Sequence, residues 1–342
     1  MARLDVTPVR LPLAAPLRTA WGELAVRELL QVRLAWSDDD FGLGEAAPLE
    51  PYDGVPLGAV AAALDAYGAI LRAAGPLDEH EELLAECAAE RDLPEALAAI
   101  DLALWDRAGR HTGRPVAHLL AAGAATHVPV NATLGAEDRA TAAAQAAAAA
   151  GAGFGCVKVK VGIGDDAGRV AAVRAAAGPA MAIRVDANGA WGDAREALAN
   201  LRALAPAGIE YAEEPVHGIA GLRAVRAAGV VPVAMDETAA EPGAAGAGAA
   251  DAVCLKIARC GGITGVLRDA RAARAAGSAV YVASSFDGPL GIAAGVHVAA
   301  SLGRLPWCGL ATLGAFAGHD GVLPPERGAI AVPAGPGLLA RR

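Results

Sequence analysis

The residues best suited to chemistry in this chain are lysines and carboxylates at the ends of short apolar runs. Lys158 and Lys160 lie two apart in GFGCVKVKVG, residues 153–162, so in a β-strand both ammonium groups leave the same face. Two like charges in apolar surroundings lower each other's pKa. A solvated edge strand would explain the pair if it stood alone, but later apolar runs also end in charged residues.

Carboxylates end the next three apolar runs, and a lysine ends the one after them. Any single carboxylate here could simply cap the helix that follows it. Three oxygen donors from neighbouring strands, however, match the coordination that Mg²⁺ prefers, and the lack of His or Cys at these ends disfavours zinc. We therefore predict a site for Mg²⁺, with Mn²⁺ as a substitute. The polar residues at these ends are Asp186 and Asn188, Glu213 and Glu214, Asp236 and Glu237, and then Lys256.

Such a site suits the removal of a proton α to a carboxylate. That proton is a very weak acid, and the dianionic enediolate left behind needs a nearby cation. A lysine can act as the base if a second ammonium group, the metal and burial lower its pKa. Lys158 should have this effect beside Lys160. Lys256 should lie across the site, where it could protonate the opposite face or hold an anion or a π-face.

These ends belong to a strand–helix pattern that begins near residue 127. Apolar strands alternating with helices indicate a parallel sheet. Seven or eight units in about 185 residues favour a closed barrel over a doubly wound sheet, for which no GxGxxG motif follows a strand. The chemistry of a barrel lies at the carboxyl ends of its strands. The expected strands cover 127–135, 155–161, 181–188, 208–215, 231–237, 251–257, 279–285 and 305–312, with helices at 165–177, 192–205, 219–228 and 263–276.

The first 50 residues alternate between apolar and polar types. This pattern predicts three antiparallel strands, the first two joined by a loop at 14–22, and helices follow at 57–74 and 93–110. Strands followed by helices indicate a small α+β domain. We expect it to cover 1–122 and to be completed by the Pro- and Gly-rich tail, 318–342, with the barrel at 123–317.

Composition limits the partners and the compartment. The net charge of -9 argues against nucleic acid or an anionic membrane surface as partner. No apolar run approaches the ~20 residues of a spanning helix, and the N-terminus lacks the layout of a signal peptide. Scattered cysteines indicate free thiols in a reducing, cytoplasmic compartment. They are Cys87, Cys156, Cys254, Cys260 and Cys308.

The motifs VKVKVG, RVDANGAW, YAEEP, AMDET and LKIARCGGIT, in this order, resemble the enolase superfamily and its muconate-lactonising-enzyme subgroup. The resemblance covers nearly the whole chain. It implies a (β/α)7β TIM-like barrel with an N-terminal α+β capping domain, a small carboxylate substrate and a homo-oligomer. This superfamily uses a lysine base together with Mg²⁺.

The resemblance also assigns residues. Lys160 matches the base, Lys158 its neighbour and Lys256 the second lysine. The implied metal ligands are Asp186, Glu213 and Asp236, with Asn188, Glu237 and Arg184 around them. Expected substrate contacts are Arg18, Trp21 and Tyr52 in lid segments, and Ser284, Ser285, Asp287 and Gly288 after the seventh barrel strand. His297 is expected to be a packed helix residue.

Several reactions fit this subgroup. VPVNATL, RVDANGAW, ASSFDGPLGIAAGVHVAA and CGLAT are most similar to o-succinylbenzoate synthases, which implies syn-dehydration of a succinyl-hydroxycyclohexadiene carboxylate. GLGEAAPLEPYDG and KIARCGGIT fit muconate-type cycloisomerases, and N-acyl amino acid racemases or dipeptide epimerases, equally well. The paired Asp typical of dipeptide epimerases has no counterpart in WCGLATLGAF. An alternative of another class is a barrel that binds an acid without turning it over.

Overall fold

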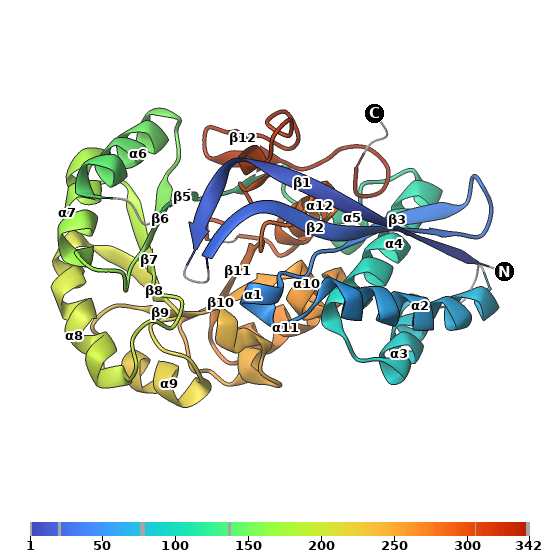
Figure 1. Cartoon of the computed structure of the whole chain (residues 1–342), viewed down its shortest axis with the longest axis horizontal. Helices are drawn as coiled ribbons and strands as arrows, with labels where there is room; N and C mark the ends of the chain where they lie inside the picture. The colour runs from blue at the N-terminus through green and yellow to red at the C-terminus, as the bar shows by residue number, and fades with distance from the viewer. Residues whose placement is uncertain (1, 20–21, 76–78, 136–137, 305, 340–342) are drawn as a thin grey trace.

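The computed structural model describes residues 2–19, 22–75, 79–135, 138–304 and 306–339. Figure 1 shows two bodies side by side: a curled parallel sheet with helices on its outside, and a long antiparallel ribbon backed by helices. The parallel sheet carries the acidic strand ends. The antiparallel body covers the barrel mouth from one side, and the expected barrel with an N-terminal capping domain is therefore confirmed.

The antiparallel sheet has the strand order β1-β2-β3 and packs against three helices. Its third strand approaches α4 so closely that side chains are excluded: a Cβ on Gly42 would lie 1.8 Å from the carbonyl oxygen of Ala103, and one on Gly44 would lie 1.9 Å from that of Ala99. The glycines therefore let the strand lie directly on the helix backbone. The elements are β1 (Arg3–Thr19), β2 (Gly22–Ala35), β3 (Phe41–Ala46), α1 (Glu50–Asp53), α2 (Leu57–Ala73), α3 (His80–Glu90), α4 (Pro94–Thr112) and α5 (Val116–Leu120).

The loop expected at 14–22 is wrong for residues 14–19 and 22, which lie in strands, while residues 20 and 21 lie outside the described residues. β1 continues to Thr19, with an irregularity between Pro12 and Leu17, after which Leu17 pairs with Leu24. Proline interrupts a ladder only locally at an edge strand or bulge, and pairing can resume beyond it. The long two-stranded ribbon therefore reaches toward the barrel (Figure 1).

The parallel sheet has the order β11-β10-β9-β8-β7-β6-β5. Single bridges from Val130 to Cys308 and from Ala283 to Gly309 join its two edges, so the expected eighth strand is reduced to two paired residues. Two 3-10 turns, η2 (Glu237–Ala240) and η3 (Ala244–Gly246), follow the fifth strand of the sheet. The strands are β5 (Ala132–Leu134), β6 (Cys156–Lys160), β7 (Ala182–Asp186), β8 (Ile209–Glu213), β9 (Val233–Met235), β10 (Ala252–Lys256) and β11 (Ala279–Ala283), and the helices are α6 (Arg139–Gly151), α7 (Asp166–Ala177), α8 (Ala194–Leu204), α9 (Ile219–Ala227), α10 (Ile257–Cys260), α11 (Ile263–Ala275) and α12 (Pro289–Ser301).

Strand register brings the charged residues to one end of the sheet. Lys160 pairs with Asp186, and Asp186 pairs with Glu213 on the next strand. Lys256 ends β10 in register with Ala283, the last residue of β11. Because the strands are parallel, their carboxyl ends form one rim.

The C-terminal tail binds both bodies. β12 (Pro325–Glu326) and β13 (Ala329–Ala331) form a small sheet with β4 (His127–Pro129), which precedes the barrel strands. Further on, Leu338 N donates to Oδ1 of Asp106 on α4 at 2.8 Å. The division of the chain at residue 122 stays a prediction. Among the described residues, no helix is both long and apolar enough to cross a membrane.

We predict that Asp106→Ala lowers the free energy of unfolding by about 3 kcal/mol, because it leaves buried donors without an acceptor. The Asp106 side chain is fully buried and also accepts from Leu43 N at 2.9 Å and Arg110 Nε at 2.5 Å. Urea unfolding measures the change. Asp5→Ala, which removes an exposed partner of Arg3, is the control and should cost less than about 1 kcal/mol. Equal losses in the two variants would contradict this role for Asp106.

Candidate active site

Three carboxylates meet at the rim of the barrel. Asp186, Glu213 and Asp236 are 0%, 0% and 4% exposed. Lys158 Nζ joins two of them, at 2.9 Å from Asp186 Oδ2 and 2.6 Å from Glu213 Oε1. Lys256 Nζ lies 2.7 Å from Asp236 Oδ2. Buried negative charges are thus balanced by ammonium groups from both flanking strands, which lowers the cost of burial.

Lys158 and Lys160 share one acceptor. Both Nζ atoms contact Asp186 Oδ2, at 2.9 Å and 2.6 Å. Lys160 Nζ also donates to Asn188 Oδ1 at 2.6 Å, and Asn188 Nδ2 donates to Glu237 Oε1 at 2.9 Å. The side chain of Lys160 is 34% exposed, against 15% for Lys158. Of the two, Lys160 therefore has the better access to a bound substrate.

Lys256 is held from the capping side by Tyr52. Lys256 Nζ donates to Tyr52 OH at 2.5 Å and lies 4.4 Å from the centre of its ring. Arg259 Nη1 donates to the same hydroxyl at 3.1 Å. Arg259, on α10, was missed by sequence reasoning; its position three residues after Lys256 in KIARC was the only available signal. Tyr52 thus reaches the barrel rim, as expected of a lid residue.

The neighbouring carboxylates dominate the electrostatics of Lys158 and Lys256. Burial lowers the pKa of Lys158, but Asp186 and Glu213 outweigh burial and raise this pKa well above its usual value. Burial is likewise outweighed by Asp236 at Lys256, whose pKa is also well above the usual value. In the protein alone the carboxylates therefore dominate, and the predicted lowering of a lysine pKa would require a further cation beside them.

The donors at the rim fit a divalent cation. Glu213 Oε2 is buried without a hydrogen-bond partner among the described residues. Burial raises the pKa of Glu213 to about 7, with Lys158 opposing and Asp186 and Asp236 adding to the shift. Carboxylates that repel one another at short range are stabilised as anions by a bound cation. Glu213 and Asp236 have ligand atoms within 4.8 Å of each other, and Asp186 is joined to Glu213 through Lys158. Carboxylate oxygens such as these suit a hard ion such as Mg²⁺.

Glu214 has a structural part in the rim. Its carboxylate accepts from the backbone N–H of Asp236 at 2.8 Å and from that of Thr238 at 3.1 Å. It also accepts from the Thr238 hydroxyl, and His217 Nδ1 lies 3.1 Å away. Glu214, His217 and Glu237 have ligand atoms within 4.8 Å of one another, but both carboxylate oxygens of Glu214 already accept hydrogen bonds from Asp236 or Thr238. Glu214 fixes the turn that presents Asp236.

Arg184 does not lie beside the acidic rim, contrary to expectation. Its Nε contacts Glu210 Oε2 at 2.6 Å, and its Nη1 donates to the Trp307 carbonyl at 2.5 Å. The guanidinium carbon lies 4.3 Å from the centre of the Tyr211 ring. Arg184 precedes Asp186 by two residues and faces the same way, so it lies about 6.6 Å deeper along the strand. It fills the lower barrel interior.

Ser284 and Ser285, predicted to contact substrate, follow β11 at the rim. Ser284 Oγ lies 2.9 Å from Thr312 Oγ1. Ser285 Oγ is buried and has no hydrogen-bond partner in the described part of the chain. A buried hydroxyl without a partner can accept or donate to a bound ligand at little cost. Ser285 therefore stays the better substrate-contact prediction of the two.

The backbone N–H of Gly288 is not available to a substrate, contrary to expectation. Glu45 Oε1 accepts from Gly288 N at 2.7 Å and from Gly291 N at 3.3 Å. Glu45 comes from β3 of the capping sheet and thus caps α12 across the domain boundary. A Cβ on Gly288 would lie 2.5 Å from Glu45 Oε2. The sequence signal for this contact was Glu45 itself, a single charged residue inside the otherwise apolar GLGEAAP.

Asp287, also expected to contact substrate, lies at the same boundary. It is 2% exposed and accepts from Ser285 N at 3.3 Å. Burial raises the pKa of Asp287 to about 6, with Arg27 opposing this shift. Arg27 is itself buried and donates to the carbonyls of Ala47 and Phe286 at 3.0 Å and 3.1 Å. Asp287 therefore belongs to the junction that anchors the loop before α12.

Three further expectations concern the lid and α12. Trp21 lies outside the described residues, and only the backbone of Arg18 is described, paired with Glu23. His297 is a packed helix residue, as expected: its Nδ1 accepts from Ala117 N at 3.1 Å, and its Nε2 lies 2.9 Å from the Leu338 carbonyl oxygen. Burial lowers the pKa of His297 to about 4.

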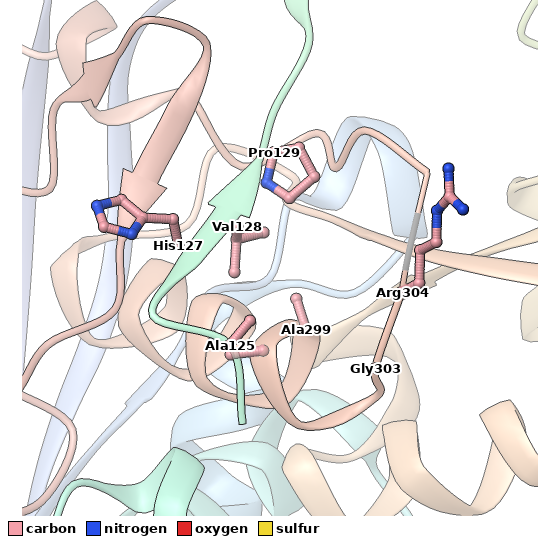
Figure 2. A pocket seen from close by; sticks show the side chains of 8 residues that line it. Ala125, His127, Val128, Pro129, Ala299, Gly303 and Arg304 are labelled. Carbon is pink, nitrogen blue, oxygen red and sulfur yellow. The ribbon is translucent and has the colours of Figure 1, made fainter. Parts of the chain in front are cut away.

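A separate surface pocket lies between β4 and the end of α12. In Figure 2, Val128 and Ala299 face into it, while His127 and Arg304 are on opposite sides. Neither element contributes a carboxylate to the rim. This pocket is therefore distinct from the candidate active site.

Comparison with known proteins places the chain in a family. Residues 1–121 match the mandelate racemase / muconate lactonizing enzyme N-terminal domain, and residues 140–340 match the enolase C-terminal domain-like family. The chain belongs to the mandelate racemase/muconate lactonizing enzyme family of the enolase superfamily. The relatives of this chain that the comparison found in this family are enzymes.

Relatives of different activity are similarly close. The chain is 39% identical over 193 residues to the o-succinylbenzoate synthase of Thermobifida fusca. This aligned region covers 54% of this chain and only 60% of that protein. It is 28% identical to muconate cycloisomerase 1-1 of Acinetobacter lwoffii over 89% of this chain and 83% of that protein. A substrate-liganded L-Ala-D/L-Glu epimerase from Bacillus subtilis superposes with a TM-score of 0.89, at 28% identity, covering 98% of this chain and 97% of that one.

The lysines allow a direct test of the rim electrostatics, because only three of the 29 basic Lys and Arg residues are lysines and all three lie at the rim. We predict that NMR titration of ¹⁵N-lysine-labelled, metal-free protein shows Lys158 and Lys256 protonated beyond the usual lysine range. Added Mg²⁺ should lower both pKa values, because it neutralises the carboxylates that hold them up. Unchanged titration curves at saturating Mg²⁺ would contradict this arrangement.

The Glu45 junction should make stability depend on pH. Burial, with Asp287 adding to it, raises the pKa of Glu45 to about 7 from 4.5. Between about pH 4.5 and 7 the folded protein therefore keeps a proton on Glu45 that the unfolded chain has lost. The stability that the protonated Glu45 contributes is complete below about pH 4.5 and is lost as the pH rises to about 7. Relative to Glu45→Gln, the wild type should lose up to about 3 kcal/mol of unfolding free energy across that range.

Unfolding measured at several pH values provides this comparison. The matched control is Glu28→Gln, which changes an exposed glutamate on β2 and should give a difference from wild type that is nearly constant with pH. A pH-independent difference for Glu45→Gln as well would show that Glu45 titrates normally.

Proposed function

We propose that this protein removes a proton α to the carboxylate of a small organic acid, with Mg²⁺ bound by Asp186, Glu213 and Asp236. The observation that carries the proposal is the convergence of three buried carboxylates between lysines from β6 and β10. The bound cation would supply positive charge beside the substrate carboxylate. Mn²⁺ is a suitable substitute because it too accepts oxygen ligands.

In this proposal Lys160 is the base. It is the most exposed of the three lysines, and Asn188 and Asp186 fix the direction of its Nζ. Lys158 holds Asp186 and Glu213 together and keeps a second positive charge beside the base. Asn188 and Glu237 act as positioning residues for Lys160.

Lys256 faces the substrate from the other side. Its ammonium group can stabilise the enediolate or return a proton to the opposite face. Tyr52 and Arg259 fix its position through the Tyr52 hydroxyl. Ser285 offers the distal end of the substrate a hydroxyl that has no hydrogen-bond partner among the described residues.

Among the reactions open to such a site, we propose syn-dehydration of a succinyl-hydroxycyclohexadiene carboxylate to o-succinylbenzoate. The support is the identity to an o-succinylbenzoate synthase, together with the lack of a carboxylate in 307–316, where a substrate ammonium group would need one. Cycloisomerisation and N-acyl amino acid racemisation are the second candidates, since two lysines on opposite sides of the metal also serve them. A cytoplasmic homo-oligomer is part of the proposal.

We predict that Lys160→Ala lowers turnover of the dehydration substrate by about 10³-fold, the usual size of a general-base effect. The rise in o-succinylbenzoate absorbance measures turnover. If the protein is a racemase instead, the wild type should exchange the α proton of an N-acyl amino acid for deuterium in D₂O. Arg268→Ala, an exposed change on α11, is the control and should leave both signals intact.

Three results would separate the alternatives. Inversion without elimination would identify a racemase. Tight binding of acids with no exchange and no product would favour a binding protein and refute catalysis. Full activity after chelation of divalent cations, or in Lys160→Ala, would refute the metal or the base, respectively.

A further inference from the structure

Cys254 places a sulfur atom beside the acidic rim, in a position that the proposed reaction does not use. It lies on β10 two residues before Lys256, so both side chains face the barrel interior. The thiol is 2% exposed. Ligand atoms of Glu213, Asp236 and Cys254 all lie within 4.8 Å of one another. Sulfur is therefore within reach of a cation that binds these two carboxylates.

A second observation also indicates a ligand at this point. Glu213 is fully buried, and its Oε2 has no hydrogen-bond partner in the described part of the chain. Among the described residues Cys254 Sγ has no hydrogen-bond partner either, whereas Sγ of Cys156, an interior cysteine on β6, lies 3.8 Å from the Val157 carbonyl oxygen. Buried polar atoms are normally satisfied, so an unpartnered carboxylate oxygen beside a thiol points to a missing cation.

The types of donor atom determine which cation would bind here. One sulfur and two carboxylates form a softer set than the three carboxylates of the proposed Mg²⁺ site. Zn²⁺ and Cd²⁺ favour thiolate donors, whereas Mg²⁺ favours oxygen alone.

We propose that Glu213, Asp236 and Cys254 form a second binding mode at the rim, for a thiophilic divalent cation. The cation binds the thiolate, and the thiol proton passes to the solvent. Because Glu213 and Asp236 are shared, this cation and Mg²⁺ exclude each other. The rim is therefore selective for Mg²⁺ only when thiophilic cations are scarce. The inference deepens the proposed metal site but is independent of the substrate.

Titration of metal-free protein with Cd²⁺ tests the proposal, because a cadmium–thiolate bond gives an ultraviolet charge-transfer band. Wild-type protein should develop the band with one equivalent of Cd²⁺, and excess Mg²⁺ should diminish it. Cys254→Ser should abolish the band and weaken Cd²⁺ binding by about tenfold or more, as loss of one good donor does. Calorimetry with Mg²⁺ should give nearly the same affinity in both proteins.

Cys156→Ser is the matched control. It removes a buried interior cysteine that starts β6, at the opposite end of its strand from Lys160, and should keep the band. A band that survives in Cys254→Ser, or that excess Mg²⁺ leaves unchanged in the wild type, would overturn the proposal. The Mg²⁺ competition needs no substitution, so the test stands even if Cys254→Ser fails to fold.

The outcome is separable from that of the proposed function. A Mg²⁺-sensitive band in a protein without turnover would support the thiophilic site and count against catalysis alone. Turnover in a protein without the band would overturn the thiophilic site alone.

Discussion

The burial of negative charge at the end of a parallel sheet is the constraint on which the rest of the structure depends. Asp186, Glu213 and Asp236 are nearly without solvent, and each alone would carry a large desolvation cost. Lysines from both sides offset part of it, which is why their pKa values are raised in the protein alone. A bound dication would take over this compensation and leave the ammonium groups available. The same charges thus stabilise the empty rim and prepare it for a metal.

The composition of the chain supports this interpretation. Arginine supplies nearly all of the positive charge, and the three lysines occur only at the rim. A guanidinium group cannot give up its proton in a protein, whereas an amine can when its surroundings change. On the surface the two residues serve solubility equally well. Lys160, the proposed base, is therefore of the residue type that can give up its proton, which an arginine at the same position could not do.

Much of the site could be predicted from the sequence, because strand periodicity and parallel register act together. The ending of each apolar run gives the rim residues Lys160, Asp186, Glu213, Asp236 and Lys256. The predictions that failed depend on how deep a side chain lies in the barrel and on contacts between distant segments of the chain. Arg184 shares a face with Asp186 but lies two residues deeper, and no local pattern indicates that Glu45 occupies the N–H of Gly288. Contacts between segments more than 200 residues apart leave no local pattern. The loop expected at 14–22 failed because proline marks a break without showing whether pairing resumes.

The two bodies are coupled at adjacent points of the chain. β3 carries Glu45, which caps α12, and α1 begins four residues after β3 ends and carries Tyr52 to Lys256. The junction at Glu45 therefore fixes where the Tyr52 segment rests on the rim. The carboxylates stand at the ends of barrel strands, and the capping segment adds one hydrogen bond to them, from Tyr52 OH to Asp236 Oδ2 at 3.3 Å. Changes elsewhere in the capping segment can therefore alter the space above the site without moving the carboxylates. Under the proposed function, the barrel would supply the proton chemistry and the capping segment would determine which acid reaches it.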